Sequence, residues 1–326
     1  MRTWGLWGWC LLLVATPVLA SGDDAAQWLD KMSRAVQTLS YEGTFVYLHG
    51  GRLEAMHIVH RGSAKGEQER LVSLTGAARE VIRSNKTITC ILPDSKSVMV
   101  DRDLPGEPFP ERFPGNIARL GRDYQFQALG TDRMAGRSAR VIAIKPRDRY
   151  RYGHRLWLDQ KTHLLLKSDL TNARGVPVEQ VMFTHLQIRD HIPDAALKPA
   201  LTGRDFTWYR GGGRAGSGGP VPDSGWRVGR VPRGFTLAYH RRHKLASGSR
   251  PVEHMMYSDG LATVSVYIEE HDGDRDDRLQ GLSAMGALNA YGRTVDGHQV
   301  TVVGEVPQAT VRMIGRSVHH ERPGKP

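Results

Sequence analysis

The chain has 326 residues, which is long enough for two domains of ordinary size. Its 45 Lys and Arg residues outnumber its 34 Asp and Glu residues, which gives a formal net charge of +11 at pH 7, and only two cysteines are present. This composition excludes a small disulfide-rich scaffold, so the fold must rely on its hydrophobic core.

Residues 1–20 are predicted to be a signal peptide. Arg2 is followed by an apolar run over 6–15, and the small or β-branched residues before Ser21 suit cleavage near Ala20–Ser21. No other segment approaches about 18 apolar residues, the length that a membrane-spanning helix needs. We therefore expect a soluble exported protein with one remaining cysteine, Cys90. Outside the cytoplasm, its basic charge points to phosphorylated lipid head groups or an acidic protein partner, and not to nucleic acid.

The mature chain is predicted to begin with an amphipathic helix over 21–39. Its apolar residues recur at helical spacing, and the hydroxyl and acidic residues at its start supply capping chemistry. Two interpretations of the stripe formed by Trp28, Met32 and Val36 stay open. The stripe faces a lipid cavity on the concave side of a sheet, or it packs plainly in the core.

Strand after strand is predicted next, in a long antiparallel meander. Residues 41–49 and 52–61 form a hairpin through Gly50 and Gly51, while four prolines in 103–116 predict a long surface loop, with a short helix over 116–121. The other predicted strands are 67–75, 78–83, 87–92, 97–101, 139–145, 154–159, 163–170 and 178–188. A sheet of this kind must cover one face or curl over something, so 21–205 is predicted to be one curled-sheet domain.

A glycine-rich linker and a second, smaller domain are predicted to follow. The linker spans 206–222 and contains the run "GGGRAGSGG", and the second domain spans 223–320. Two hairpins with Asp-Gly turns, at 259–260 and 296–297, and a helix over 307–318 predict an α+β fold for this domain. The whole chain is therefore predicted to be mainly β with α, in an α+β arrangement.

An unusual concentration of arginine and tyrosine marks the segment 147–155, which reads as the start of a strand over 149–159. Two hypotheses explain it: the arginines bind an anion, either an acidic partner or a lipid phosphate, or they pair with acids on neighbouring strands. Arginine suits the first because its planar fork binds carboxylate and phosphate with two hydrogen bonds. The candidate residues are Arg147, Arg149, Tyr150, Arg151, Tyr152 and Arg155.

No motif for catalysis, metal or cofactor binding stands out. The fourteen histidines are not spaced as a ligand set, and neither H-E-x-x-H, paired C-x-x-C nor G-x-S-x-G is present. Gly211, Gly213 and Gly216 match a dinucleotide-binding pattern, but no strand precedes them within a βαβ unit, and Pro220 and Pro222 follow where a helix should begin. We expect no metal, no cofactor and no enzymatic activity.

Several long segments resemble the periplasmic sigma-E factor regulatory protein family, RseB/MucB. The resemblance covers nearly the whole mature chain in family order. It is carried by "YEGTFVYLHGGRLEAMHIVHR", "AGRSARVIAIKPRDRYRYGHRLWLDQKTHLLLKSDL", "VPRGF", "MYSDGLATVSVYIE" and "GALNAYGRTVDGHQVTVVGEVPQATVRMI".

This resemblance implies the fold and the function together. It implies that the large domain is an unclosed antiparallel β-barrel of the LolA type and that the small α+β domain packs against it. It also implies a periplasmic, non-enzymatic regulator that binds the periplasmic domain of a RseA/MucA-like anti-sigma factor and shields it from regulated proteolysis. A lipid or lipopolysaccharide signal is implied to release the anti-sigma factor. Homodimers or higher oligomers are implied as well. The alternative is a periplasmic lipid or lipoprotein carrier, since the large domain alone would suffice for that.

Overall fold

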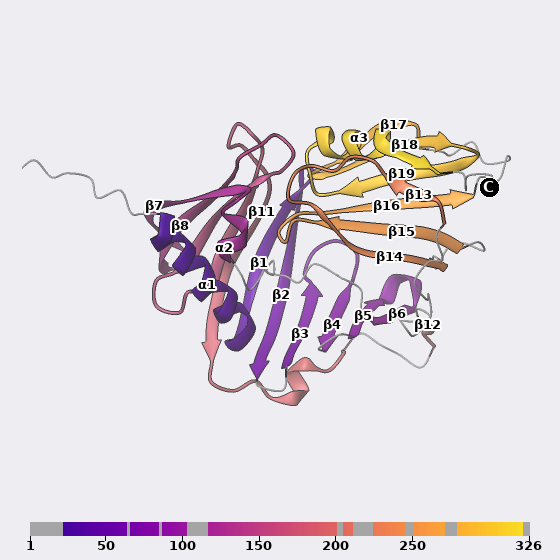
Figure 1. Cartoon of the computed structure of the whole chain (residues 1–326). Helices are drawn as coiled ribbons and strands as arrows, with labels where there is room; N and C mark the ends of the chain where they lie inside the picture. The colour runs from indigo at the N-terminus through magenta and orange to yellow at the C-terminus, as the bar shows by residue number, and fades with distance from the viewer. Residues whose placement is uncertain are drawn as a thin grey trace, which may run out of the picture.

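Two large twisted β-sheets, each with a helix packed on it, and one small two-stranded sheet form the main architecture of the part of the chain that the structure describes (Figure 1). A computed structural model describes residues 22–63, 66–84, 87–102, 117–200, 205–210, 224–244, 251–270 and 279–321. The predicted signal peptide, the proline-rich segment 103–116 and the residues 211–222 of the predicted linker lie outside these described residues.

The larger sheet has twelve strands among the described residues, in the order β12-β6-β5-β4-β3-β2-β1-β11-β10-β9-β8-β7. It is antiparallel except for the β12–β6 pair, and it stays open because β7 and β12 are its two edges. Its strands are β1 (Ser40–His49), β2 (Arg52–Ser63), β3 (Gly66–Ser73), β4 (Glu80–Ser84), β5 (Thr87–Leu92), β6 (Ser97–Arg102), β7 (Tyr124–Met134), β8 (Arg137–Pro146), β9 (Gly153–Asp159), β10 (Leu165–Thr171), β11 (Pro177–Arg189) and β12 (Thr207–Arg210).

The helix α1 (Gly22–Thr38) lies across one face of this sheet, against β7 and β2 (Figure 1). Its apolar stripe supplies Leu29, Met32 and Val36 to the core of the domain, where they are almost fully buried. The apolar period of 3.6 residues places these side chains on one face, and burying that face holds the helix in place. The predicted helix is confirmed. Short helical turns, α2 (Ile117–Leu120), η1 (Pro93–Ser95) and η2 (Asp194–Leu197), complete the domain.

The hairpin between β1 and β2 follows the prediction. His49 pairs with Arg52, so Gly50 and Gly51 alone form the turn. Both have positive φ angles, 52° and 78°, as a two-residue hairpin turn requires. The turn register places alternate residues of β1 on the core face, among them the buried Tyr41 and Phe45.

Two parts of the large sheet differ from the predicted strands. The strand β7 was not predicted at all; it pairs with β8 at the edge of the sheet and has a register shift next to Gly130, whose φ is 108°. The strand β12 lies inside the segment 206–222 assigned to the linker. Thr207 N–H donates to the Lys96 carbonyl oxygen at 2.8 Å, and the Lys96 ammonium contacts Asp205 at 2.7 Å. These contacts extend the sheet beyond residue 205.

The smaller sheet has six strands among the described residues, in the order β14-β15-β16-β19-β18-β17, and α3 (Gln308–Ser317) packs on it. Its core contains Val266, Val302, Val311 and Ile314, which come from strands and helix alike. Its strands are β14 (Thr236–Lys244), β15 (Pro251–Ser258), β16 (Thr263–Glu270), β17 (Gly281–Met285), β18 (Leu288–Val295) and β19 (His298–Gly304), and a separate pair joins β13 (Trp226–Val228) to β20 (Val318–His320).

The predicted fold class is correct: a large, open, antiparallel sheet with a helix, and a smaller α+β unit. Both predicted hairpins of the smaller unit are present. Asp296 and Gly297 form a two-residue turn with positive φ angles of 44° and 77°. Within the part of the chain that the structure describes, no helix is both long and apolar enough to cross a membrane.

Candidate functional site

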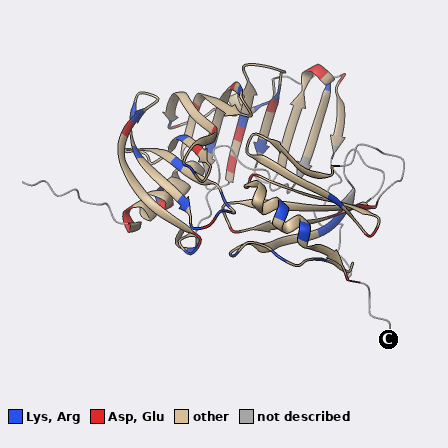
Figure 2. Cartoon of the chain, turned by 90° about the horizontal axis from the view of Figure 1, so that it is seen from above, with Lys and Arg blue, Asp and Glu red and all other residues tan. Residues whose placement is uncertain are grey.

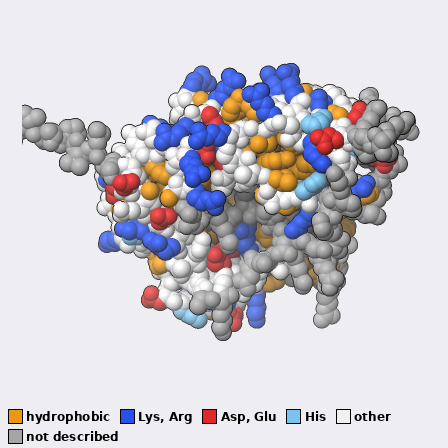
Figure 3. Space-filling model, viewed as in Figure 1, with side chains coloured by type: hydrophobic (Ala, Val, Ile, Leu, Met, Phe, Trp, Pro, Cys, Tyr) orange, Lys and Arg blue, Asp and Glu red, His pale blue; other side chains and the backbone are white. Residues whose placement is uncertain are grey.

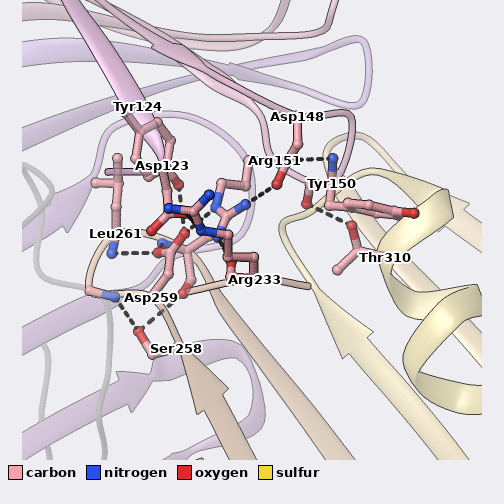
Figure 4. Close-up of polar contacts among 12 residues, drawn as sticks. Asp123, Tyr124, Asp148, Tyr150, Arg151, Arg233, Ser258, Asp259, Leu261 and Thr310 are labelled. Atoms are coloured by element: carbon pink, nitrogen blue, oxygen red, sulfur yellow. Dashed lines mark hydrogen bonds and ion pairs between the residues drawn. The ribbon is translucent and has the colours of Figure 1, made fainter. Parts of the chain in front are cut away.

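The arginine-rich segment lies where the two sheets meet, but it is not the strand that its sequence predicts (Figure 4). The strand β9 begins at Gly153, and residues 147–152 form a loop after β8. The Asp148 carboxylate accepts a hydrogen bond from the Tyr150 N–H at 2.9 Å, a local bond that turns the backbone. Arg149 and Arg151 therefore do not share one face of a strand, and the prediction of a two-faced strand over 149–152 is wrong.

Arg151 points into the junction between the two domains and is 1% exposed. Its guanidinium makes ion pairs with Asp148 and with Asp259 of the β15–β16 hairpin, and it donates to the Arg233 carbonyl oxygen (Figure 4). Asp123 lies 4.0 Å from the same guanidinium. A buried charge needs such partners, because removing it from water is otherwise very unfavourable. Arg151 joins the domains.

The surroundings of Arg151 complete a buried ionic cluster. The Tyr124 hydroxyl donates to Asp259 at 2.9 Å, and the rings of Tyr124 and Phe235 lie 5.6 and 4.9 Å from the guanidinium carbon of Arg151. Burial, and then the negative charge of Asp259, raises the pKa of Tyr124, so its hydroxyl stays protonated. Burial alone would lower the pKa of Arg151, but the hydrogen bond and charge of Asp259 outweigh it, and the pKa is raised.

Further hydrogen bonds connect the loop 147–152 to the smaller domain. The Thr310 hydroxyl, in the first turn of α3, donates to the Tyr150 carbonyl oxygen at 2.6 Å. The Asn289 amide donates to the Tyr152 hydroxyl at 3.0 Å. Tyr150 and Tyr152 thus help to position one domain against the other.

A basic pocket opens beside this junction, and Arg149 and Tyr150 form one side of it. Its volume is about 580 Å³. It is lined by Arg149, Tyr150, Arg230, Ala309, Arg312, Met313, Arg316 and Ser317, with no acidic residue among them. In Figure 2 the ribbon of α3 is coloured blue at its basic positions, and Figure 3 shows Lys and Arg side chains gathered over the same region. Its lining makes this pocket a candidate site for an anionic ligand.

The six predicted site residues therefore separate into three groups. Arg149 and Tyr150 line the basic pocket, and Arg151 and Tyr152 hold the domain junction. Arg147 is exposed, with its guanidinium 3.4 Å from the Gly121 carbonyl oxygen, and Arg155 lies on β9; neither lines the pocket.

Of the predicted lipid-cavity residues of α1, Met32 and Val36 belong to the core, and Trp28 packs against it. Met32 is 0% exposed and Val36 is almost fully buried, and both belong to the core cluster of the large domain. Trp28 is half-buried, and its ring lies 4.8 Å from the ring of His163. This arrangement favours the alternative of plain core packing.

Sequence reasoning missed the residues that the smaller domain contributes. Arg312 and Arg316 are spaced i, i+4 on the predicted helix, opposite its apolar face. This spacing was the available signal, because it places the two side chains together on an exposed surface. Arg230 lies in the loop between β13 and β14, where the sequence has no periodic signal. The sequence indicates Asp259 only as a turn residue. It does bond the Leu261 N–H at 2.9 Å, and it also binds Arg151.

Comparisons with known proteins place this architecture among regulators of sigma factors. Residues 24–201 match the family profile of the MucB/RseB N-terminal domain, and residues 220–319 match that of the MucB/RseB C-terminal domain. The sigma factor AlgU regulatory protein MucB of Pseudomonas aeruginosa is 34% identical over 317 residues, which cover 95% of each chain.

Solved structures of such proteins share the fold over most of the chain. A chain from the complex of Pseudomonas aeruginosa MucA and MucB has 31% sequence identity and a TM-score of 0.71, covering 92% of this chain and 100% of that one. A crystal structure of MucB in complex with MucA(peri) has the same identity and coverage and a TM-score of 0.70.

Proposed function

The chain belongs to the MucB/RseB family, and on that premise we propose that it is a periplasmic negative regulator of a sigma-E-type envelope stress response. It binds the periplasmic domain of a MucA-like membrane anti-sigma factor and shields that domain from regulated proteolysis. A lipid or lipopolysaccharide signal loosens the complex. The family consists of regulatory proteins, and the expectation that the chain is not an enzyme agrees with this.

One observation carries the proposal. The likeness to a protein solved together with MucA extends over 92% of this chain, so it includes both domains and their junction. The net charge of +11 supports the same function, because an acidic protein segment or a phosphorylated lipid would be attracted to it. Export to the periplasm follows from the predicted signal peptide over 1–20.

The docked second domain favours a regulator over a carrier of lipids or lipoproteins. A carrier needs a cavity in the curled sheet and no second domain. Here Arg151, Asp259 and Asn289 hold the smaller domain in place, and Met32 of α1 fills core space. We expect the mature chain to form homodimers or higher oligomers, which light scattering on the purified protein would measure.

A pull-down from envelope extract tests the proposal. The tagged mature chain should retain a single-span membrane protein with a MucA-like periplasmic domain, identified by mass spectrometry. Added lipopolysaccharide should release it. Recovery of a set of lipoproteins in its place would support the carrier and contradict the regulator.

A further inference from the structure

The basic pocket is built by both domains. The large domain contributes Arg149 and Tyr150 from the loop after β8. The smaller domain contributes Arg230, which lies just after β13, and the outer face of α3 with Arg312 and Arg316. A ligand in this pocket would touch both domains at once.

The backbone around the pocket is held in place by bonds that need no ligand. The Ser317 hydroxyl accepts a hydrogen bond from the Arg230 N–H at 3.0 Å and contacts the Arg230 carbonyl oxygen at 3.1 Å. The Gly229 N–H donates to the Ser317 carbonyl oxygen at 3.1 Å. On the opposite side, Thr310 holds the Tyr150 carbonyl oxygen. The pocket is therefore organised before any ligand enters, which lowers the entropy that binding must overcome.

No described carboxylate neutralises the charge of the pocket. Among the residues that the structure describes, none of the four pocket arginines makes an ion pair with a carboxylate. Arg312 and Arg316 are one helical turn apart, and like charges at this spacing repel each other. Arg149 lies over the Tyr150 ring, 5.4 Å from its centre, which leaves much of its guanidinium edge for other bonds. An anion would relieve the repulsion and accept these donors.

We propose that this pocket, formed by Arg149, Arg230, Arg312 and Arg316, is a binding site for a phosphate or diphosphate group. Four arginines line a pocket of about 580 Å³ that has no acidic lining residue, which favours a ligand with more than one negative charge. A phosphate monoester carries nearly two charges and three acceptor oxygens, whereas a peptide carboxylate carries one charge and two oxygens. Arginine also binds phosphate with its planar fork. Phosphate binding at this pocket does not depend on the proposed regulatory function. Only the idea that such binding releases the anti-sigma factor rests on that function.

Calorimetric titration of the full mature chain with inorganic pyrophosphate tests the site. We expect saturable binding, weakened at least about tenfold by Arg312→Gln with Arg316→Gln, because two charge-assisted contacts are lost. Both side chains are exposed on α3, so circular dichroism should show an unchanged fold. Arg149→Gln should weaken binding as well, since the large domain supplies one side of the pocket. The matched control is Arg133→Gln with Arg174→Gln, two exposed arginines whose removal lowers the net charge equally.

The outcomes separate this inference from the regulatory proposal. Absence of pyrophosphate binding, or equal weakening by both double variants, would overturn the site even if the pull-down succeeds. Vesicles of phosphatidylcholine with and without phosphatidic acid identify the source of the phosphate. Displacement of the chain from phosphatidic acid vesicles by pyrophosphate would assign the lipid head group to the pocket. In a different outcome, both double variants still bind the vesicles, and only the α3 variant loses pyrophosphate binding. That outcome would restrict the pocket to soluble phosphates.

Discussion

Replacing Arg151 by methionine should weaken the attachment of the smaller domain. Methionine fills much of the same space but removes the charge, and this leaves Asp259 buried with its side chain 1% exposed. Breaking a buried ion pair by removing one partner is typically unfavourable by about 3–5 kcal/mol. Asp259 keeps the Tyr124 hydroxyl and the N–H groups of Leu261 and Ala262, so we expect the lower end, about 3 kcal/mol.

Urea unfolding of the mature chain, followed by circular dichroism and tryptophan fluorescence, measures this loss of free energy of unfolding. The matched control is Arg149→Met, two residues away, where the side chain is exposed and has no described carboxylate partner. That change should alter the free energy of unfolding by no more than about 0.5 kcal/mol. Hydrogen exchange at 147–153 should also accelerate in the Arg151 variant alone, because the opening is local to the junction.

A second substitution distinguishes a lost ion pair from lost packing. Asp259→Asn in the Arg151→Met background removes the uncompensated charge and keeps an oxygen for the Leu261 and Ala262 N–H groups. We expect it to restore about 0.5–3 kcal/mol, the usual size of coupling between residues in contact. If Arg151→Met is no more destabilising than Arg149→Met, the ionic cluster does not hold the junction and the reasoning fails.

The other predictions concern separate parts of the chain. Burial and the charge of Lys31 lower the pKa of His163, so the unfolded state binds more protons than the folded state below about pH 6.5. The free energy of unfolding should therefore fall from pH 7 to pH 5. The variant His163→Asn, whose side chain tolerates the φ of 63°, should reduce this pH dependence of the urea midpoint. In Gly62→Ala the new Cβ would lie 2.5 Å from the Gln37 carbonyl oxygen, so we expect a loss of about 1–3 kcal/mol, and a melting temperature equal to that of wild type would refute the clash. Intact-mass measurement of exported protein should give a chain that starts at Ser21, and a lipid on Cys10 would contradict the signal peptide. Limited proteolysis should cut first within 211–219, as its glycine-rich composition predicts, and first cuts inside 139–170 would contradict the domain boundary.

Local signals were enough to predict most individual elements. The apolar period predicted α1, and glycine or Asp-Gly pairs between alternating strands predicted the hairpins β1–β2 and β18–β19. These features depend on residues close together in the chain. The edge strand β7 was missed because its outer face is polar and Gly130 interrupts its alternation, so its place depends on pairing with β8.

The arrangement of the site could not be predicted because its contacts are distant in the sequence. Arg151 and Asp259 are 108 residues apart, and Tyr150 and Thr310 are 160 apart. The arginine-rich composition marks the segment 147–155, but alternation could not show that Arg151 turns inward while Arg149 lines a pocket. Asp148, through its bond to the Tyr150 N–H, ends the strand pattern.

The most direct test of the central claim is the binding of the purified mature chain to the purified periplasmic domain of the MucA-like protein from the same bacterium. Fluorescence anisotropy with a labelled periplasmic domain measures the dissociation constant, and added envelope protease measures protection of that domain from cleavage. We expect saturable binding, slower cleavage in the complex, and loss of both effects when lipopolysaccharide is added. Absence of binding, or a bound periplasmic domain that is cleaved as fast as the free one, would contradict it.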